Sequence, residues 1–506
     1  MLDAVIVLAA AAGVLAQPSS PSKTASTDCA ALARMSLPDV RITSAEAVAA
    51  TPDGTPVPHC KLLGVIGTEI RFQALLPDAW NGRFVMGGNG GFAGSLDSDF
   101  RALKRGYAFA NTDTGHEGSG IQAGWALGHP ERLVNYGHVA VHRTADTAKA
   151  VIRAYYGRPP KYAYFDGCSN GGRQALMEAQ RYPQDFDGVL AGAPAYDFTN
   201  IAAAFVKNIQ AAFPARDSAR TPVVSADNRA LIGRAALDAC DASDGVRDQV
   251  IDAPNSCRFS LASVKSCPND TAAPDCLTAA QRRAIVAIYG PATAGSREIY
   301  PGWPVGGEND EDGWRLWITG VDQGLLAGTN GQASSLQMAF APELFKYMVF
   351  GNPNWDYTTY DLANWARDTK AIAPILNADN PDLSGFKAHG GKLIIWHGWA
   401  DPALNAVSTL NYYKRVQAHD PASSTFTRLY LLPGVEHCNG GSGPDRVEWL
   451  TAIAEWVEQG KAPARLMSSK MADGKTVRTR PVCPYPQRAV YKGTGSTDDE
   501  HNFICK

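Results

Sequence analysis

The sequence predicts an α/β fold in which helices cover both faces of a mostly parallel sheet and a second domain is inserted. Three observations carry this prediction. Strand-like and helix-like segments alternate from about 62 to 194, the pattern breaks at Ala195 for roughly 190 residues, and it resumes near 390. Parallel strands joined by helices produce such alternation. A chain of 506 residues also exceeds one ordinary core, which favours two domains.

Each expected element has a local reason. Strands are expected where short apolar runs end in glycine or polar turn residues, at 82–94, 106–116, 161–172, 187–195, 390–402 and 426–438. Helices are expected where apolar residues recur at helical spacing and a glycine or proline ends the run, at 142–157, 173–183 and 447–460.

The interruption between the two halves reads as a lid domain over the sheet rather than as a linker. It holds four cysteines and five tryptophans, too many apolar and cross-linking side chains for a structureless connection. We therefore expect a lid at 196–385 and a sheet-containing domain made of 17–195 and 386–506.

Composition excludes several classes of protein. The net charge of −3 gives no electrostatic footprint for nucleic acid or for an anionic membrane surface, so neither is expected as a partner. None of the ten cysteines forms a C-x-x-C pair, which argues against zinc ribbons and thioredoxin-type chemistry. Disulfide bonds formed in an oxidising compartment are the better interpretation.

The first residues favour secretion. The apolar run from Ala4 to Ala16 has the length of a signal-peptide core, and Val14-Leu15-Ala16 resembles a cleavage site, so residues 1–16 are predicted to be a signal peptide. The run is too short to span a bilayer as a helix. Asp3 stands where a basic residue is usual, and a buried N-terminal helix is the alternative. The expected location is extracellular or periplasmic.

Ser169 stands in a G-x-S-x-G pattern that runs from Gly167 to Gly171, within the stretch YFDGCSNGGRQA. An apolar strand precedes the serine and a helix follows it, which is the context of a nucleophile elbow. The N-terminal dipole of that helix would face an oxyanion formed at the serine. The sequence therefore predicts a nucleophile at Ser169, with a structural turn as the alternative.

Such a nucleophile needs two partners in the chain order Ser, Asp, His. Asp401 and His437 each follow a predicted strand, so both fall in loops at the carboxyl edge of the sheet, where the elbow also points. His437 would take the serine proton, and Asp401 would fix the tautomer of His437. Two rival histidines have other interpretations: His397 as a wall of the substrate pocket, and His116 as a loop residue hydrogen-bonded to backbone.

A cysteine adjoins each outer member of this triad. Cys168 precedes Ser169, and Cys438 follows His437. If the triad forms, these cysteines are neighbours, and a disulfide between them would tie nucleophile to base. Closing so long a loop adds up to about 5 kcal/mol to the free energy of unfolding, because the cross-link lowers the entropy of the unfolded chain. The alternative is that Cys168 is free and is itself the nucleophile.

The stretches GCSNGGRQALMEAQRYPQDFDGVLAGAPA, WHGWADP and HCNGG together resemble the Cys-Ser…Asp…His-Cys signature of the tannase and feruloyl esterase family. The resemblance extends from roughly Cys29 to Cys505. It implies an α/β-hydrolase core, an inserted lid and hydrolysis of the esters of aromatic acids. It also implies the remaining disulfide pairs: Cys29–Cys60, Cys240–Cys257, Cys267–Cys276 and Cys483–Cys505.

The resemblance also implies an oxyanion hole. One donor is the backbone N–H of Asn170, and the second comes from the loop GGNGGFAG, near Gly90 or Gly91. Glycine amides approach a tetrahedral intermediate without obstruction by a side chain. A phosphate-cradling loop is the alternative, but no G-K-[ST] follows and no dinucleotide fingerprint is complete.

The lid contains a candidate calcium site in CDASDGVRDQVID, residues 240–252. Three hard carboxylates around a glycine suit Ca²⁺, and from chemistry alone an Asx-rich surface turn fits equally well. The family places a structural calcium on a matching Asp-x-x-Asp-Gly-x-x-Asp run. Carried over, the ligands are carboxylates of Asp241, Asp244 and Asp248 and carbonyls of Val246 and Val250. No organic cofactor is expected, and a serine triad needs no catalytic metal.

The predicted function is that of a secreted serine esterase that hydrolyses aromatic esters, with feruloyl esters as the expected substrates. The substrate is expected to be free or attached to plant polysaccharide or tannin. Galloyl esters and mono(2-hydroxyethyl) terephthalate are alternatives. Leu404, a pocket candidate, stands where the terephthalate-hydrolysing member has an aromatic residue, which argues mildly against that substrate. Candidates for holding the aromatic ring, or else for ordinary core packing, are Trp303, Trp314, Trp317, Trp355 and Trp365. A silent binding module, which would lack a triad residue, is the non-enzyme alternative.

Overall fold

A computed structural model describes residues 27–506 except 52–56, 216–220, 322–325, 327–328 and 330–332. The predicted signal peptide, residues 1–16, lies outside the described residues. Within the described part of the chain, no helix is both long enough and apolar enough to cross a membrane.

Nine strands of the described chain form one mixed sheet in the order β1-β2-β3-β5-β4-β6-β7-β10-β11. The strands from β5 to β11 in this order run parallel, and β1, β2 and β3 add to them in antiparallel fashion. Their bounds are β1 (Val40–Val48), β2 (His59–Ile66), β3 (Ile70–Pro77), β4 (Arg83–Gly87), β5 (Ala108–Thr112), β6 (Tyr162–Cys168), β7 (Gly188–Gly192), β10 (Lys392–Gly398) and β11 (Thr427–Leu432). The predicted parallel sheet is thus confirmed, and the antiparallel strands β1–β3 extend it beyond the prediction.

Helices cover both faces of this sheet because side chains alternate between the faces along each strand. On β6, Phe165 packs in the core that contains α3 (Ala140–Tyr156), α4 (Asn170–Arg181), α11 (Ser384–His389) and α12 (Ala406–His419). Its neighbour Tyr164 packs on the opposite face against α1 (Phe100–Lys104) and α13 (Trp449–Gln459). Leu393 and Ile394 of β10 divide between the faces in the same way. Strands buried on both faces explain the continuous apolar runs in the sequence.

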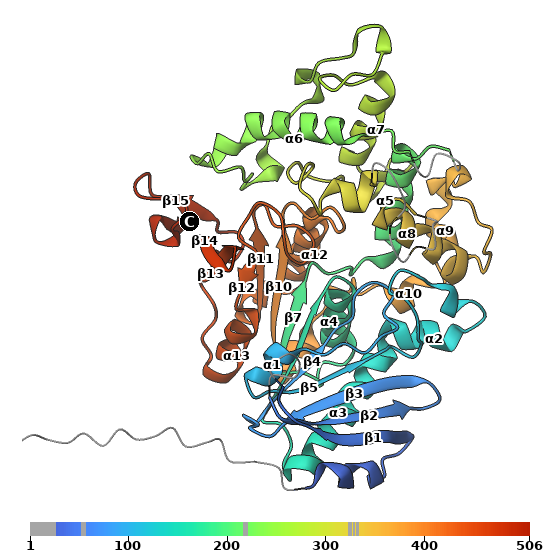
Figure 1. The fold of residues 1–506 in the computed structure, drawn as a ribbon, viewed down its shortest axis with the longest axis vertical. Helices are drawn as coiled ribbons and strands as arrows, with labels where there is room; N and C mark the ends of the chain where they lie inside the picture. Colours follow the sequence, from blue (N-terminus) through green and yellow to red (C-terminus); the bar gives the residue numbers. More distant parts are fainter. Residues whose placement is uncertain (1–26, 52–56, 216–220, 322–325, 327–328, 330–332) are drawn as a thin grey trace, which may run out of the picture.

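The insert between β7 and β10 is mainly helical and has its own apolar core. Its elements are α5 (Phe198–Ala212), α6 (Ala226–Cys240), α7 (Ala279–Tyr289), β8 (Ala292–Ala294), β9 (Arg297–Tyr300), α8 (Leu336–Glu343), α9 (Trp365–Asp368) and α10 (Ala373–Leu376). Figure 1 shows α6 and α7 above β7 and β10, at the top of the molecule. The same apolar core includes Phe92 and Leu404 from loops of the sheet domain, so the insert packs on the loops that carry the site. The domain limits at 195 and 386 remain a prediction.

The C-terminal segment adds small sheets beside the insert. β12 (Arg446–Val447), β13 (Leu466–Ala472) and β14 (Lys475–Val482) form a three-stranded sheet, and β15 (Ala489–Tyr491) pairs with β16 (Phe503–Cys505). The short helix α2 (Pro130–Val134) precedes α3 on the sheet domain. All five disulfides expected from the sequence are present: Cys29–Cys60, Cys168–Cys438, Cys240–Cys257, Cys267–Cys276 and Cys483–Cys505.

Candidate active site

Ser169 lies at the turn between β6 and α4, with backbone angles φ 65° and ψ −125°. This is a strained conformation for a residue with a side chain, and such strain concentrates at functional sites. The two ends of the turn approach closely, since a Cβ at Gly167 would lie 2.5 Å from the backbone of Gly171. The Ser169 amide donates to the carbonyl of Gly192 at 3.0 Å, which ties the turn to β7. Glycine at 167 is therefore required by close backbone approach.

Asp401 and His437 meet at the carboxyl ends of β10 and β11. His437 Nδ1 donates to Oδ2 of Asp401 at 2.8 Å, and the Asp401 side chain is fully buried. Oδ1 of Asp401 accepts the amides of Ala403 and Leu404, both at 2.8 Å. Burial by itself would raise the pKa of Asp401, but the neighbouring His437 and His397 outweigh it and hold that pKa well below its usual range. The aspartate is therefore ionised and fixed in place.

His397 does not line the cavity beside Ser169, so its interpretation as a pocket wall is wrong. The side chain is fully buried behind Asp401. Nε2 donates to Oδ2 of Asp401 at 3.1 Å and to the carbonyl of Leu404 at 2.9 Å, and Nδ1 lies 2.8 Å from Oγ1 of Thr409. His397 lies inside because β10 is buried on both faces up to Gly398. His397 stands four residues before Asp401, but in a strand followed by a loop this spacing does not predict a contact.

The Cys168–Cys438 disulfide joins the residues next to Ser169 and His437, with the two Cα atoms 6.0 Å apart. Cys438 has a positive φ of 66°, so the chain turns sharply directly after His437. The two cysteines are 270 residues apart in sequence. No free cysteine occurs among the described residues, so a thiol nucleophile at Cys168 is excluded.

Buried polar side chains hold the glycine loop against the nucleophile turn. The Asn170 side chain donates to the carbonyl of Asn89 at 3.2 Å and accepts from the hydroxyl of Tyr136 at 3.0 Å and from Nε of Arg173 at 2.7 Å. The same Tyr136 hydroxyl lies 2.9 Å from the carbonyl oxygen of Gly91. Burial lowers the pKa of the fully buried Arg173, whose guanidinium also donates to three backbone carbonyls. Sequence reasoning missed Tyr136 and Arg173, because nothing local marks them as partners of this loop.

A cavity of about 60 Å³ opens directly beside Ser169. Gly91, Asn170, His437 and Leu404 line it, whereas Gly90 is not among its lining residues. The rest of the lining is almost entirely apolar and comes from both the sheet domain and the insert: Phe92, Ala195, Phe198, Ile201, Ala202, Phe205, Trp317, Phe340, Ala341, Leu344 and Ala403. A flat apolar group next to Ser169 fits such a lining.

Of the five tryptophans expected as ring-holding candidates, Trp317 lines this cavity. Its ring meets the His437 ring edge-on, with centroids 4.9 Å apart, and stacks on Phe340 at 6.0 Å. Trp303, Trp314 and Trp365 are buried in the core of the insert. His116 donates to the carbonyl of Phe92 at 2.8 Å, and burial lowers the pKa of this histidine to about 4.

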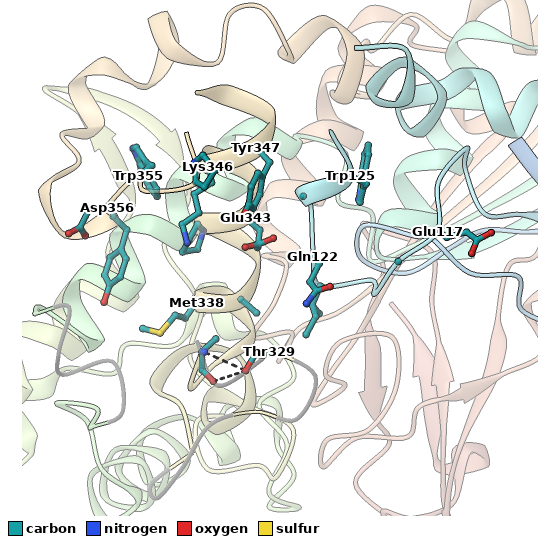
Figure 2. A pocket seen from close by; sticks show the side chains of 18 residues that line it. Glu117, Gln122, Trp125, Thr329, Met338, Glu343, Lys346, Tyr347, Trp355 and Asp356 are labelled. Carbon is teal, nitrogen blue, oxygen red and sulfur yellow. Dashed lines mark hydrogen bonds between the residues drawn. The ribbon is translucent and has the colours of Figure 1, made fainter. Parts of the chain in front are cut away.

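A larger cavity of about 620 Å³ lies on the other side of α8. Met338, Ala339, Pro342 and Glu343 of α8 face it, whereas Phe340, Ala341 and Leu344 face the small cavity at Ser169. Figure 2 shows Gln122 and Trp125 of the sheet domain on one side and Glu343, Tyr347 and Trp355 of the insert on the other. Aromatic rings and hydrogen-bonding groups therefore both line this cavity.

The candidate calcium ligands lie in and directly after a 3₁₀ helix, Asp241–Asp244, which is followed by Gly245 with φ 90°. Asp241 Oδ1 accepts the amides of Asp248 and Gln249, both at 3.1 Å. Asp244 and Asp248 line a small cavity with Val250 and Asp252, and Arg480 of β14 pairs with Asp248. Oδ2 of Asp252 is buried without a hydrogen-bond partner among the described residues.

The donor types of this loop fit calcium. Burial raises the pKa of Asp244 and of Asp248, and it raises that of Asp252 to about 7, although Arg480 offsets part of this rise. The Cys240–Cys257 disulfide joins the two sides of the loop. Val246 accordingly lies within a loop that is covalently closed, and its amide donates to Oδ1 of Asp244 at 2.9 Å.

Comparison with known proteins places the chain in a family. The model of the family described as "Tannase and feruloyl esterase" matches residues 57–506. An uncharacterized esterase of Xanthomonas campestris pv. campestris is 36% identical over 95% of this chain and 91% of its own length. The mono(2-hydroxyethyl) terephthalate hydrolase of Piscinibacter sakaiensis is 32% identical over 91% of this chain and 87% of its own.

A solved structure shows the same architecture. The crystal structure of feruloyl esterase B from Aspergillus oryzae superposes with a TM-score of 0.82 at 25% identity. The match covers 94% of this chain and 99% of that one, so it includes the insert as well as the sheet domain.

Proposed function

Because the chain belongs to the tannase and feruloyl esterase family of carboxylic ester hydrolases, we propose that Ser169, His437 and Asp401 form its catalytic triad and that feruloyl esters are its preferred substrates. The supporting observation is the apolar cavity that Ser169 and His437 share and that Trp317 and Phe340 also line. This apolar lining suits the ring and propenoyl chain of a ferulate. It suits a gallate less well, because the three hydroxyls of the gallate would lose their hydrogen bonds to water without gaining hydrogen bonds to the protein.

The proposed reaction proceeds through an acyl-enzyme. Ser169 Oγ attacks the ester carbonyl while His437 Nε2 takes the hydroxyl proton, and the same proton then passes to the departing alcohol. A water molecule repeats these steps on the acyl-enzyme and releases the aromatic acid. Asp401 fixes the tautomer of His437 through the 2.8 Å contact and stabilises the imidazolium that forms.

The oxyanion hole of this mechanism consists of backbone amides. Asn170 is the first residue of α4, so its N–H combines with the positive end of the helix dipole. The second donor is assigned to the glycine loop, at Gly91, which lines the cavity. Tyr136 and Asn170 hold this loop in register with the elbow. Such preorganised donors stabilise the tetrahedral intermediate without reorganising during the reaction.

A substrate panel tests the assignment. Methyl ferulate, methyl gallate and mono(2-hydroxyethyl) terephthalate are compared by kcat/KM with the wild-type enzyme, and methyl ferulate is expected to be turned over best. A higher kcat/KM for methyl gallate or for the terephthalate would contradict the assignment of feruloyl esters and would identify that other class of ester as the preferred substrate. Leu404 in the cavity, where the resemblance places an aromatic residue for the terephthalate, supports the expected order.

Replacing the nucleophile separates an esterase from a silent binding module on the same scaffold. Ser169→Ala is expected to lower kcat by several orders of magnitude while the melting curve stays close to that of the wild type. A Ser169→Ala enzyme that turns over methyl ferulate at a near-normal rate would overturn the triad.

Attachment of the aromatic acid to a plant polysaccharide or tannin is a further part of the proposal. The large cavity beside α8 offers the rings of Trp125, Tyr347 and Trp355 together with Gln122 and Glu343, groups that suit stacking on and hydrogen bonding to a polyhydroxylated alcohol. A feruloylated oligosaccharide should then show a lower KM than methyl ferulate, and Trp355→Ala should remove that difference without changing methyl ferulate turnover.

Secretion and calcium complete the proposal. Disulfide bonds form and persist in oxidising compartments, and five of them among the described residues support an extracellular or periplasmic protein. A structural Ca²⁺ would be held by Asp241, Asp244 and Asp248 with the carbonyls of Val246 and Val250. When bound it would supply positive charge that fixes this loop of the insert, with no part in the ester chemistry.

A further inference from the structure

Three metal-ligating side chains gather at the far end of α4 from Ser169. His142 comes from α3, Glu178 from the last turns of α4, and Asp185 from the turn that follows. One ligand atom from each lies within 4.8 Å of the others, and His142 Nδ1 is 2.7 Å from Oδ2 of Asp185. The His142 ring stacks on Tyr182 with centroids 4.0 Å apart and planes 4° from parallel, which fixes its orientation.

Glu178 is the unexplained member of this cluster. Its side chain is 1% exposed, and both carboxylate oxygens are buried without a hydrogen-bond partner among the described residues. A buried, unpaired carboxylate is costly, and such groups are normally paired, protonated or bound to a metal. Burial, reinforced by Asp185, raises the pKa of Glu178 well above its usual range. A positive charge near these two carboxylates would remove the cost.

We propose that His142, Glu178 and Asp185 bind a divalent transition-metal ion, with Zn²⁺ as the expected occupant. One imidazole nitrogen and two carboxylate oxygens are ligands that Zn²⁺ accepts at about 2.0–2.2 Å. Two ligands of a tetrahedral ion stand about 3.4 Å apart at such bond lengths, so the contact between His142 and Asp185 needs to open only slightly. His142 is the partly exposed member of the three, so a water molecule that completes the coordination would approach from its side.

The ion would be structural. Glu178 follows Ser169 by nine residues, which is about 13.5 Å along the axis of α4. The ligands connect α3 to the last turns of α4 and to the turn between α4 and β7, so binding would stabilise the packing of the helix that carries Ser169. The competing chemistry is one proton shared by Glu178 and Asp185, and it predicts no affinity for metal.

The test combines thermal unfolding with direct location of the ion. Full-length protein stripped of metal is titrated with ZnCl₂. One Zn²⁺ is expected to bind per chain and to raise Tm by several degrees. Glu178→Gln keeps the shape of the side chain and should abolish both effects. His501→Ala is the matched control, because it removes an exposed histidine that also lies between two carboxylates, Asp499 and Glu500, and it should leave both effects intact.

Two outcomes would overturn the site. The first is a Glu178→Gln protein that binds Zn²⁺ as the wild type does. The second is a ZnCl₂-soaked wild-type crystal with no anomalous peak at the zinc edge between His142, Glu178 and Asp185. The crystal decides the question even where Glu178→Gln fails to fold, because it uses the wild-type chain. These readouts are independent of esterase activity.

Discussion

His397 and Asp401 form a fully buried pair in which the imidazole Nε2 donates to Oδ2 of the aspartate at 3.1 Å. The same oxygen accepts His437 Nδ1 at 2.8 Å. One carboxylate oxygen of the proposed triad is therefore held between two histidines, one at the cavity beside Ser169 and one in the interior.

This pair leads to a prediction for His397→Phe, which removes the second donor and keeps an aromatic ring. A hydrogen bond to a charged group is worth about 1.5–3 kcal/mol, so kcat should fall by about 10- to 150-fold. KM should change little, because His397 does not line the cavity. The acid limb of the pH profile should move to higher pH, since Asp401 loses a contact that lowers its pKa.

Two variants control that measurement. His397→Gln retains a donor and should recover part of kcat. His138→Phe removes a half-buried histidine bonded to the hydroxyl of Tyr182 and should leave the pH profile unchanged. An unshifted acid limb in His397→Phe would show that the histidine only fills space.

The second prediction concerns the tether between nucleophile and base. Replacing both Cys168 and Cys438 by alanine should lower kcat by up to about a hundredfold, because displacement of a catalytic group by about 1 Å has this effect. Replacing Cys29 and Cys60 together removes a disulfide far from the site and should lower Tm with little change in kcat. Peptide mapping of the non-reduced protein checks the pairing, and a Cys168 that is alkylated without reduction would contradict it.

The third prediction is a pH dependence at Glu436, the residue before His437. Burial, with Asp310, Asp312 and Asp401 nearby, raises the pKa of Glu436 to about 9, and Lys470 offsets this only in part. The unfolded chain loses this proton near its ordinary pKa of about 4.3. The native state thus binds more protons between these values, and the free energy of unfolding falls as pH rises through this window.

Glu436→Gln stays neutral and should lack this loss. Urea unfolding of the wild type and of Glu436→Gln between pH 5 and about 9 measures the difference, which should grow with pH in favour of the variant. A difference that does not vary with pH would mean that the native and unfolded states hold this proton equally well.

The fourth prediction concerns the proposed calcium. Chelation should lower Tm, because the carboxylates of Asp241, Asp244 and Asp248 then repel one another without a cation. Added Ca²⁺ should restore Tm, and it should do so in the Glu178→Gln variant as well, whereas the rise in Tm on adding ZnCl₂ requires Glu178. Asp244→Asn should abolish the calcium effect and leave the response to ZnCl₂ at Glu178 intact. An unchanged melting curve after chelation, with no metal found by elemental analysis, would contradict the proposal.

The sequence by itself determined the sheet, the elbow and the chain order of the site. β6, β7, β10 and β11 are buried on both faces, so each reads as a continuous apolar run ended by turn residues. Local signals of this kind place Ser169, Asp401 and His437 at strand ends without any knowledge of the fold. The strands β1, β2 and β3 were not predicted one by one, because polar residues interrupt the apolar residues along each of them.

Tertiary structure alone decided which side chains meet across the fold. His397 contacts Asp401 on the inner side because the pleat of β10 and the loop after it set their directions, and a spacing of four residues in a strand and loop does not specify this. Tyr136, Arg173 and Asn170 come from segments that only packing brings together. The same holds for His142, Glu178 and Asp185, whose chemistry depends on distances between two helices and a turn. Sequence records periodicity along one element, whereas burial and charge at a site depend on contacts between elements.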